Sequence, residues 1–248
     1  MPGGEGASAH EAPERWLAVR VRAGSDREAV IAALFSVIIG LPAFRLRGPY
    51  FTIATIGVAE AVRVSASTVE FTGGSSGLRM PADTFDFNKN YFAMIVLAIV
   101  TVAVSAYVKR SALGRALAAI KQDIDAAEAV GIHSTRFKIA AHAISAALVA
   151  LAGSLYAINF QYIAPGSVFD FRLSLSIVLM PIIGGVGTVV GPLFGALIFS
   201  TLQIKLLPIP ALRDSFLFIY GGLLIVVMLF EPMGLVGLMR RMGRMGRG

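Results

Sequence analysis

Long apolar runs constrain this chain more than any other feature. Residues 91–108 form a run of eighteen residues without a charge, and 137–163 form a second long apolar run. A helix adds about 1.5 Å per residue, so about twenty apolar residues cross the hydrocarbon core of a bilayer. The chain is 56% hydrophobic and 15% charged, whereas soluble domains are about 45–50% apolar and about 25% charged. The sequence therefore predicts an all-α, polytopic membrane protein.

Further apolar segments extend the predicted bundle. Residues 29–44 are short for a bilayer crossing, 50–69 are long enough, and 215–230 form the last apolar run. A polar loop, 71–90, follows the second of these runs and contains several glycines, which favour turns with positive φ.

One long apolar stretch, 173–207, does not read as a single helix. Pro181 and a run of glycines interrupt it, and proline removes a backbone donor that a continuous helix needs. We therefore expect two short helices, 173–184 and 190–206, that meet at a glycine-rich break. The predicted fold is a transmembrane bundle of about six to seven helices with one Gly/Pro-broken segment.

Basic residues lie at the ends of the apolar runs, which accounts for the net charge of +7. Lys and Arg are enriched in cytoplasmic loops, so these regions are expected inside the cell, and no nucleic-acid partner is expected. Residues 1–28 lack the apolar core of a signal peptide and are expected to form a flexible polar extension before a membrane domain, 29–238. The three basic regions are Arg45 with Arg47, the segment 109–136, and the tail 239–248.

The basic segment 109–136 also has a helical pattern. Its apolar and small residues recur at spacings of three and four, which places them on one helical face. Such a helix in a cytoplasmic loop is either a docking surface for a partner or a connector packed on its own bundle, and the spacing does not separate the two. The face consists of Leu113, Leu117, Ile120, Ile124, Ala127 and Gly131.

Polar residues inside the apolar runs are candidates for a transport path. Glu60 and Arg63 lie three residues apart, on one helical face. Ionisable residues at membrane depth face a bundle interior or water, so the pair either lines a path or forms a structural bridge near the end of its span. The glycine-rich break has two interpretations as well, a path-lining backbone or a tight hairpin made for packing. The path candidates are Thr52, Thr55, Glu60, Gly184, Gly185 and Gly187.

The sequence offers no catalytic constellation. It has no cysteine, its 3 histidines are scattered, and no phosphate-binding GKS or GKT motif is present. We therefore expect a protein that is not an enzyme and that needs no cofactor or metal.

Several motifs, in order along the chain, resemble the permease subunit of bacterial branched-chain amino acid ABC transporters of the LivM type. The resemblance extends from about residue 31 to residue 238 and comprises many short matches. These are LRGPYFTIAT (46–55), TGGSSGL (72–78), GRALAAIKQD (114–123), AAEAVGI (126–132), GGVGT (184–188) with Gly191-Pro192, and FEPMGL (230–235).

The resemblance implies a multi-pass subunit of the bacterial plasma (inner) membrane that takes part in ATP-driven import of branched-chain amino acids. It implies a homologous second permease subunit, two cytoplasmic ATP-binding subunits that hydrolyse the ATP, a periplasmic substrate-binding protein and membrane lipid as partners. It also implies that the segment 109–136 receives the ATPase movement. The residues implied in this coupling are Gly114, Arg115, Leu117, Ile120, Lys121, Asp123, Ala127, Glu128 and Gly131.

The N-terminus departs from the family pattern. Family members carry further membrane helices before the LRGPYF-like motif, and residues 1–28 match none of them. We therefore expect the chain to be a shortened version of a longer permease. The alternatives are a urea or short-amide ABC permease of the same fold, a secondary transporter that needs no ATPase, and an inactive truncated permease.

Overall fold

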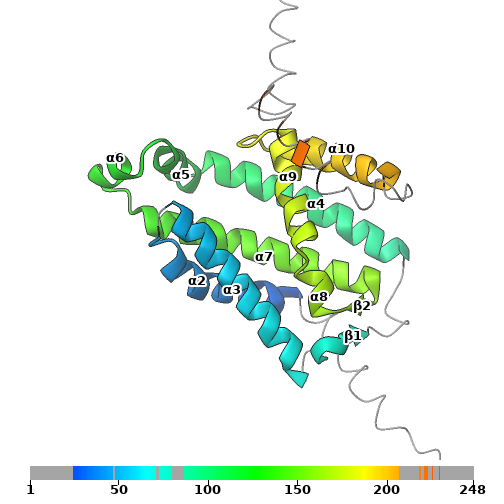
Figure 1. The fold of residues 1–248 in the computed structure, drawn as a ribbon. Coiled ribbons are helices and arrows are strands. Elements are labelled where there is room, and N and C mark those ends of the chain that lie inside the picture. Colours follow the sequence, from blue (N-terminus) through cyan, green and yellow to red (C-terminus); the bar gives the residue numbers. More distant parts are fainter. Residues whose placement is uncertain are drawn as a thin grey trace, which may run out of the picture. The chain divides into compact units, whose positions relative to one another are not determined.

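The computed structural model describes residues 25–46, 48–70, 73–79 and 87–206, together with positions 218, 221, 222, 225 and 229. The structure divides into two compact units, Met1–Val168 and Phe169–Gly248, and Figure 1 labels their helices and strands. Arg47, the tail 239–248, most of the extension 1–28 and most of the last predicted span lie outside the described residues.

Four long helices make up most of the first unit, and they confirm the four apolar segments predicted there. The helix α3 begins at a proline in its first turn, directly after Gly48, whose φ of 64° stops the preceding chain from continuing as a helix. The four helices are α2 (Ser25–Ala43), α3 (Pro49–Thr68), α4 (Phe87–Arg110) and α7 (Ser134–Phe160).

The most extensive helix contact in the first unit is between α2 and α7. The ring of Phe44, just beyond α2, meets the edge of the His142 ring on α7 with 5.4 Å between centroids. The many small residues of α7 predict a helix buried in the bundle, whereas within this unit most of α7 is uncovered. Only Ser134 and Ala157 of α7 are buried, because the neighbours of this helix in the unit leave much of its surface uncovered.

The loops at one end of these helices form a small clasp, which the sequence does not predict. The strand β1 (Leu78–Arg79) pairs antiparallel with β2 (Tyr162–Ile163), and two-residue strands are too short to show an alternating pattern. The predicted positive φ angles are confirmed at Gly73, Gly74 and Gly77. A Cβ on Gly77 would overlap the carbonyl oxygen of Ile163, so only glycine allows this approach. Two one-turn helices flank the clasp, η2 (Gly74–Ser76) and α8 (Pro165–Val168).

The second unit contains a helical hairpin at the predicted glycine-rich break. The helices α9 (Phe171–Gly184) and α10 (Gly191–Leu206) confirm the two short helices expected there. A Cβ on Gly184 would overlap the backbone oxygen of Gly191, and a Cβ on Gly195 would overlap that of Met180. The two backbones are therefore in direct contact, which larger side chains would prevent.

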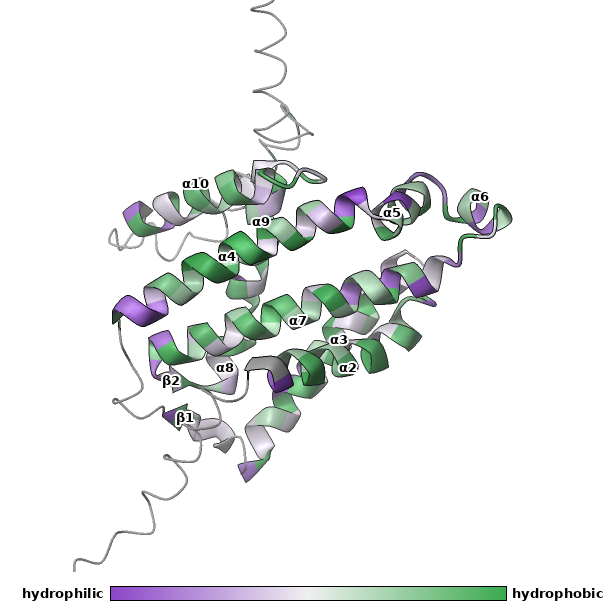
Figure 2. Cartoon of the chain, turned by 180° about the vertical axis from the view of Figure 1, so that it is seen from behind, coloured by the Kyte–Doolittle hydropathy of each residue, from purple (hydrophilic) through white to green (hydrophobic). Residues whose placement is uncertain are grey.

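Three described stretches are long and apolar enough to cross a membrane: Phe87–Arg110, Ser134–Phe160 and Pro165–Gly184, the last of which includes α8 and α9. Figure 2 shows hydrophobic residues along α4 and α7 and hydrophilic residues at the ends of α4. The helices α2 and α3 are not among the three. These findings support a helical membrane protein.

Candidate functional site

The chain between α4 and α7 forms two short helices, α5 (Ala112–Gln122) and α6 (Ile124–Ala129), where the spacing predicts a single helix. The break falls at Asp123, whose backbone is extended, with φ −155° and ψ 122°. Its Oδ1 accepts hydrogen bonds from the backbone N–H groups of Asp125, at 2.9 Å, and Ala126, at 3.0 Å. Asp123 thus caps the start of α6, and a capping side chain competes with continued helix.

A tight corner connects α4 to α5. The backbone N–H of Ser111 bonds to the carbonyl of Tyr107 at 3.0 Å, and its hydroxyl donates to the carbonyl of Val108 at 2.7 Å. Gly114 lies against the end of α4, so that a Cβ there would overlap the Val108 oxygen and lie 2.6 Å from the Lys109 oxygen. The glycine at position 114 therefore allows α5 to fold directly onto α4.

The apolar face of α5 and α6 packs on the chain itself. Ile120 is 5% exposed and Ala127 is 4% exposed, while Leu113, Leu117 and Ile124 are half-buried. These helices contact α4 and α7. The apolar face thus packs as a connector would, and the opposite face is exposed. Its exposed residues are Arg115, Ala118, Lys121, Gln122, Asp125, Ala126 and Glu128.

Gly131 ends α6 in the left-handed conformation, with φ 87°, and the space around it is open. Its N–H donates to the carbonyl of Glu128 at 3.0 Å, and the N–H of Ile132 donates to the carbonyl of Ala127 at 3.0 Å. This pattern is a common glycine C-cap of a helix. The Ser134 hydroxyl donates to the Glu128 carboxylate, which joins α6 to the first turn of α7.

A cavity of about 530 Å³ adjoins this turn. It lies where the turn after α2 meets the connection from α6 to α7, and two of its lining residues are arginines from these two regions. The lining residues are Arg45, Glu128, Gly131, Ile132, His133, Ser134, Thr135 and Arg136.

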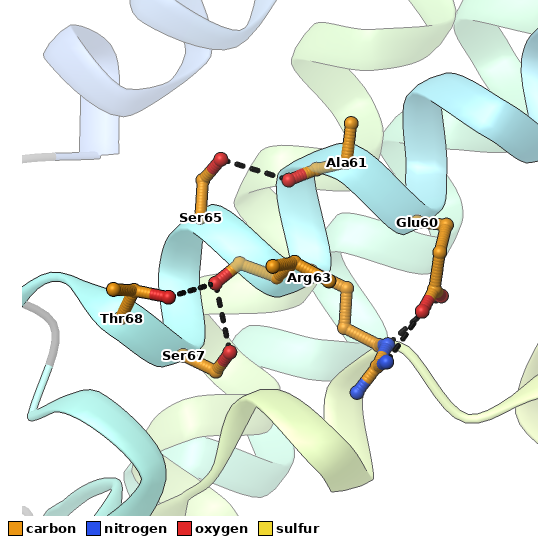
Figure 3. A network of polar contacts seen from close by, with 7 residues as sticks. Glu60, Ala61, Arg63, Ser65, Ser67 and Thr68 are labelled. Atoms are coloured by element: carbon orange, nitrogen blue, oxygen red, sulfur yellow. Dashed lines mark hydrogen bonds and ion pairs between the residues drawn. The ribbon is translucent and has the colours of Figure 1, made fainter.

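The predicted path residues of α3 form contacts within their own helix. The Thr55 hydroxyl lies 3.0 Å from the carbonyl oxygen of Phe51 and 2.9 Å from that of Thr52. The Arg63 guanidinium binds both carboxylate oxygens of Glu60, with 2.8 Å between Nε and Oε2 (Figure 3). The hydroxyls of Ser65, Ser67 and Thr68 donate to carbonyls one turn earlier, as Figure 3 also shows. The ion pair and these three hydroxyl bonds all lie on exposed parts of α3.

The predicted path glycines belong to the hairpin of the second unit. Gly184 and Gly185 are buried, and Gly187 is exposed in the turn with φ 85°. Close helix packing explains Gly184, and the turn explains Gly187. A role of these glycines in a path stays a prediction, as does the coupling role of the residues on α5 and α6.

One polar pair that the sequence does not single out joins α4 to α7. The Asn90 Nδ2 lies 3.4 Å from the Oδ1 of Asn159. Asn90 is 7% exposed, and its own Oδ1 has no hydrogen-bond partner among the described residues. Asn90 directly precedes the apolar run 91–108, where a polar residue is expected at the end of a membrane span. No local pattern therefore predicts its contact with Asn159.

Comparison with known proteins gives one family. The sequence model of the family described as "Branched-chain amino acid transport system / permease component" matches residues 28–228. The chain is 28% identical over 242 residues to the high-affinity branched-chain amino acid transport system permease protein LivM of Salmonella typhimurium, a match that covers 85% of this chain and 56% of the relative. The chain therefore spans little more than half the length of this relative.

Of two further relatives, one is named for the same kind of transport system and one for a different system. The high-affinity branched-chain amino acid transport system permease protein BraD of Pseudomonas aeruginosa is 28% identical over 144 residues, covering 58% of this chain and 46% of the relative. The autoinducer 2 import system permease protein LsrC of Yersinia enterocolitica is 25% identical over 219 residues, covering 81% and 60%. No solved structure matches the chain.

Proposed function

The chain belongs to the family of branched-chain amino acid transport system permease components, and we propose that it is the membrane-spanning permease subunit of an ATP-driven importer for branched-chain or related amino acids. In this role it hydrolyses nothing itself. It couples the movement of cytoplasmic ATP-binding subunits to substrate translocation across the plasma (inner) membrane. A homologous second permease subunit and a periplasmic substrate-binding protein complete the transporter.

The observation that carries this proposal is the two-sided character of α5 and α6. Their apolar side packs on α4 and α7, which are two of the helices long and apolar enough to cross a membrane. Their other side exposes charged and small residues, including Arg115, Lys121 and Ala118. A partner seated on the exposed side would push on α4 and α7 directly, because buried side chains such as Ile120 transmit displacement through close packing.

The details of the α4–α5 corner and of α6 support transmission of force. Gly114 keeps α5 against the end of α4 without an intervening side chain. The bond from Ser134 to Glu128 attaches α6 to the start of α7. A displacement of the segment would therefore reach two membrane helices through separate contacts, rather than be lost in a flexible loop.

The substrate is proposed from the family and from the LivM and BraD relatives, which are named for branched-chain amino acid transport. LsrC, named for autoinducer 2 import, supports a second candidate, an importer of the same fold for another small polar solute. Uptake assays with leucine, isoleucine and valine against urea, short amides and autoinducer 2 separate these candidates.

The experiment that tests the function uses the chain coexpressed with its second permease and ATP-binding subunits. We expect that Gly131→Trp and Ala118→Trp reduce copurification of the ATP-binding subunits and reduce uptake into proteoliposomes by at least about tenfold, equivalent to about 1.4 kcal/mol. A third variant, Glu128→Arg, is expected to uncouple ATP hydrolysis from uptake. Ser75→Trp, exposed on η2 beside the clasp, is the matched control and leaves all three readouts unchanged.

Two results would contradict the proposal. Unchanged uptake in the Gly131→Trp and Glu128→Arg variants, with normal insertion into the membrane, would remove the coupling role of the segment. Uptake by this chain alone, driven by an ion gradient and indifferent to ATP, would instead identify a secondary transporter.

A further inference from the structure

A balanced ion pair lies near the middle of α3. Glu60 is the twelfth of the 20 residues of this helix, which is about 30 Å long, close to the thickness of a hydrocarbon core. The side chains remain 57% exposed at Glu60 and 37% exposed at Arg63. The pair is therefore central in α3 rather than terminal. If α3 crosses the membrane in the transporter, as its length allows, ionisable groups at this position face water or a polar ligand rather than lipid.

The pair keeps unused hydrogen-bonding capacity. Arg63 contacts Glu60 through Nε and Nη2, and its Nη1 has no partner among the described residues. Guanidinium carries five N–H donors, and each carboxylate oxygen has two lone pairs. A ligand that carries one positive and one negative group can therefore bind to Glu60 and Arg63 at the same time. The bond between Glu60 and Arg63 need not break.

Apolar residues flank the pair on the same face of α3. Ile56 precedes Glu60 by four residues and Val64 follows it by four, spacings that place all three on one side of the helix. Ile56 is 60% exposed and Val64 is 48% exposed, and Ile53, one turn earlier, is 67% exposed. A ligand at the ion pair would thus lie beside aliphatic side chains.

The geometry points to a substrate contact on α3 for a zwitterionic α-amino acid with an aliphatic side chain. Its ammonium group binds the Glu60 carboxylate, its carboxylate binds the Arg63 guanidinium, and its side chain lies against Ile56 or Val64. This inference rests on the proposed transport function and names the residues that form one wall of the path.

The balance of charge gives this wall its selectivity. The two side chains carry no net charge together, so a zwitterion meets both of its charges with opposite ones. An amine without a carboxylate, or a carboxylate without an amine, leaves one of the two side chains unmatched, and an unmatched charge away from bulk water is costly. The wall therefore favours amino acids over the corresponding amines and acids.

Thiol labelling tests whether the substrate passes this face. The chain has no cysteine, so a single Gly57→Cys variant places one thiol three residues before Glu60, in open space. Gly153→Cys is the matched control, since Gly153 is also helical, exposed and free of neighbours. In the full transporter we expect a membrane-impermeant thiol reagent to label Gly57→Cys, and leucine turnover to slow that labelling severalfold without affecting Gly153→Cys. A Gly57→Cys thiol that does not react, or whose reaction leucine leaves unchanged, overturns the inference.

Transport by charge-neutralised variants supplies a second test. We expect Glu60→Gln and Arg63→Gln to lower leucine uptake at least tenfold, while the liganded binding protein still stimulates ATP hydrolysis. Ser65→Ala, which loses only a bond to the carbonyl of Ala61, keeps normal uptake. If the wild-type transporter imports leucine with ATP and both Gln variants do so equally well, this inference fails and the proposed function stands. If the wild-type transporter imports no amino acid, the proposed function fails as well.

Discussion

Gly114 on α5 lies directly against the carbonyl oxygen of Val108 on α4, with no room for a Cβ between them. We expect Gly114→Ala to move α5 away from α4, because both sides of the contact are backbone and neither can rotate aside. The strain should cost about 1–3 kcal/mol, as overpacking does in other proteins. The melting temperature of the purified subunit should fall. Uptake by the full transporter should fall as well.

The control for this substitution is Gly153→Ala. Gly153 lies within α7, and a Cβ there meets nothing within 4 Å. Alanine in a helix interior is favoured over glycine by about 0.5–1 kcal/mol, so this variant should be as stable as the parent or more stable. Equal melting temperatures for Gly114→Ala and Gly153→Ala would contradict the close contact between Gly114 and the Val108 oxygen.

Asp123 is expected to hold α6 as a separate helix. Asp123→Ala removes the acceptor for the N–H groups of Asp125 and Ala126, and loss of an N-cap costs about 0.5–2 kcal/mol. Hydrogen exchange of residues 124–130 should accelerate, while exchange in α4 stays the same. Asp123→Asn retains a capping oxygen and should preserve most of the protection. Equal exchange in the Ala and Asn variants would mean that another interaction fixes the break.

The hairpin of the second unit should be sensitive to the smallest added side chain. Gly195→Ala would drive a methyl group into the Met180 carbonyl, so α9 and α10 must separate and their packing is lost. We expect a lower melting temperature of the subunit in detergent. Gly187→Asn is the comparison, since it lies in open space with φ 85°, a conformation that asparagine tolerates. A Gly195→Ala variant as stable as Gly187→Asn would contradict the close backbone contact.

The two asparagines of α4 and α7 should differ in the cost of their removal. Asn159→Ala strips Asn90 of its only described partner and leaves both of its polar atoms buried and unpaired, which costs about 1–3 kcal/mol. Asn90→Ala removes the group whose Oδ1 is already unpaired, so its cost should be smaller. Chemical or thermal unfolding of the two single variants measures the difference, and a larger loss in Asn90→Ala would contradict it.

Hydrophobic length predicts most of the helices, because each apolar run in the described part forms the helix expected. The periodic stripe of 109–136 predicts the face that packs inward, but not the break, which depends on whether Asp123 bonds to its own neighbours. Spacing alone predicts the Glu60–Arg63 pair, since the partners are three residues apart. It cannot predict Asn90 with Asn159, or Gly77 with Ile163, since these contacts join distant segments. The requirement for glycine at position 114 becomes clear only from the path of the neighbouring backbone.

The clasp of β1 and β2 fastens one end of α7 to another part of the first unit. It ties the chain beyond α7 to the loop beyond α3 through the pairing of Leu78 with Ile163, and the Tyr162 hydroxyl adds a bond to the Ser76 carbonyl at 2.9 Å. The helix α7 has 27 residues, so it extends about 40 Å from α6 to this clasp. If a partner displaces α6, this end of α7 would be held by the clasp, and the displacement of α7 would be largest at its other end, where Ser134 bonds to Glu128.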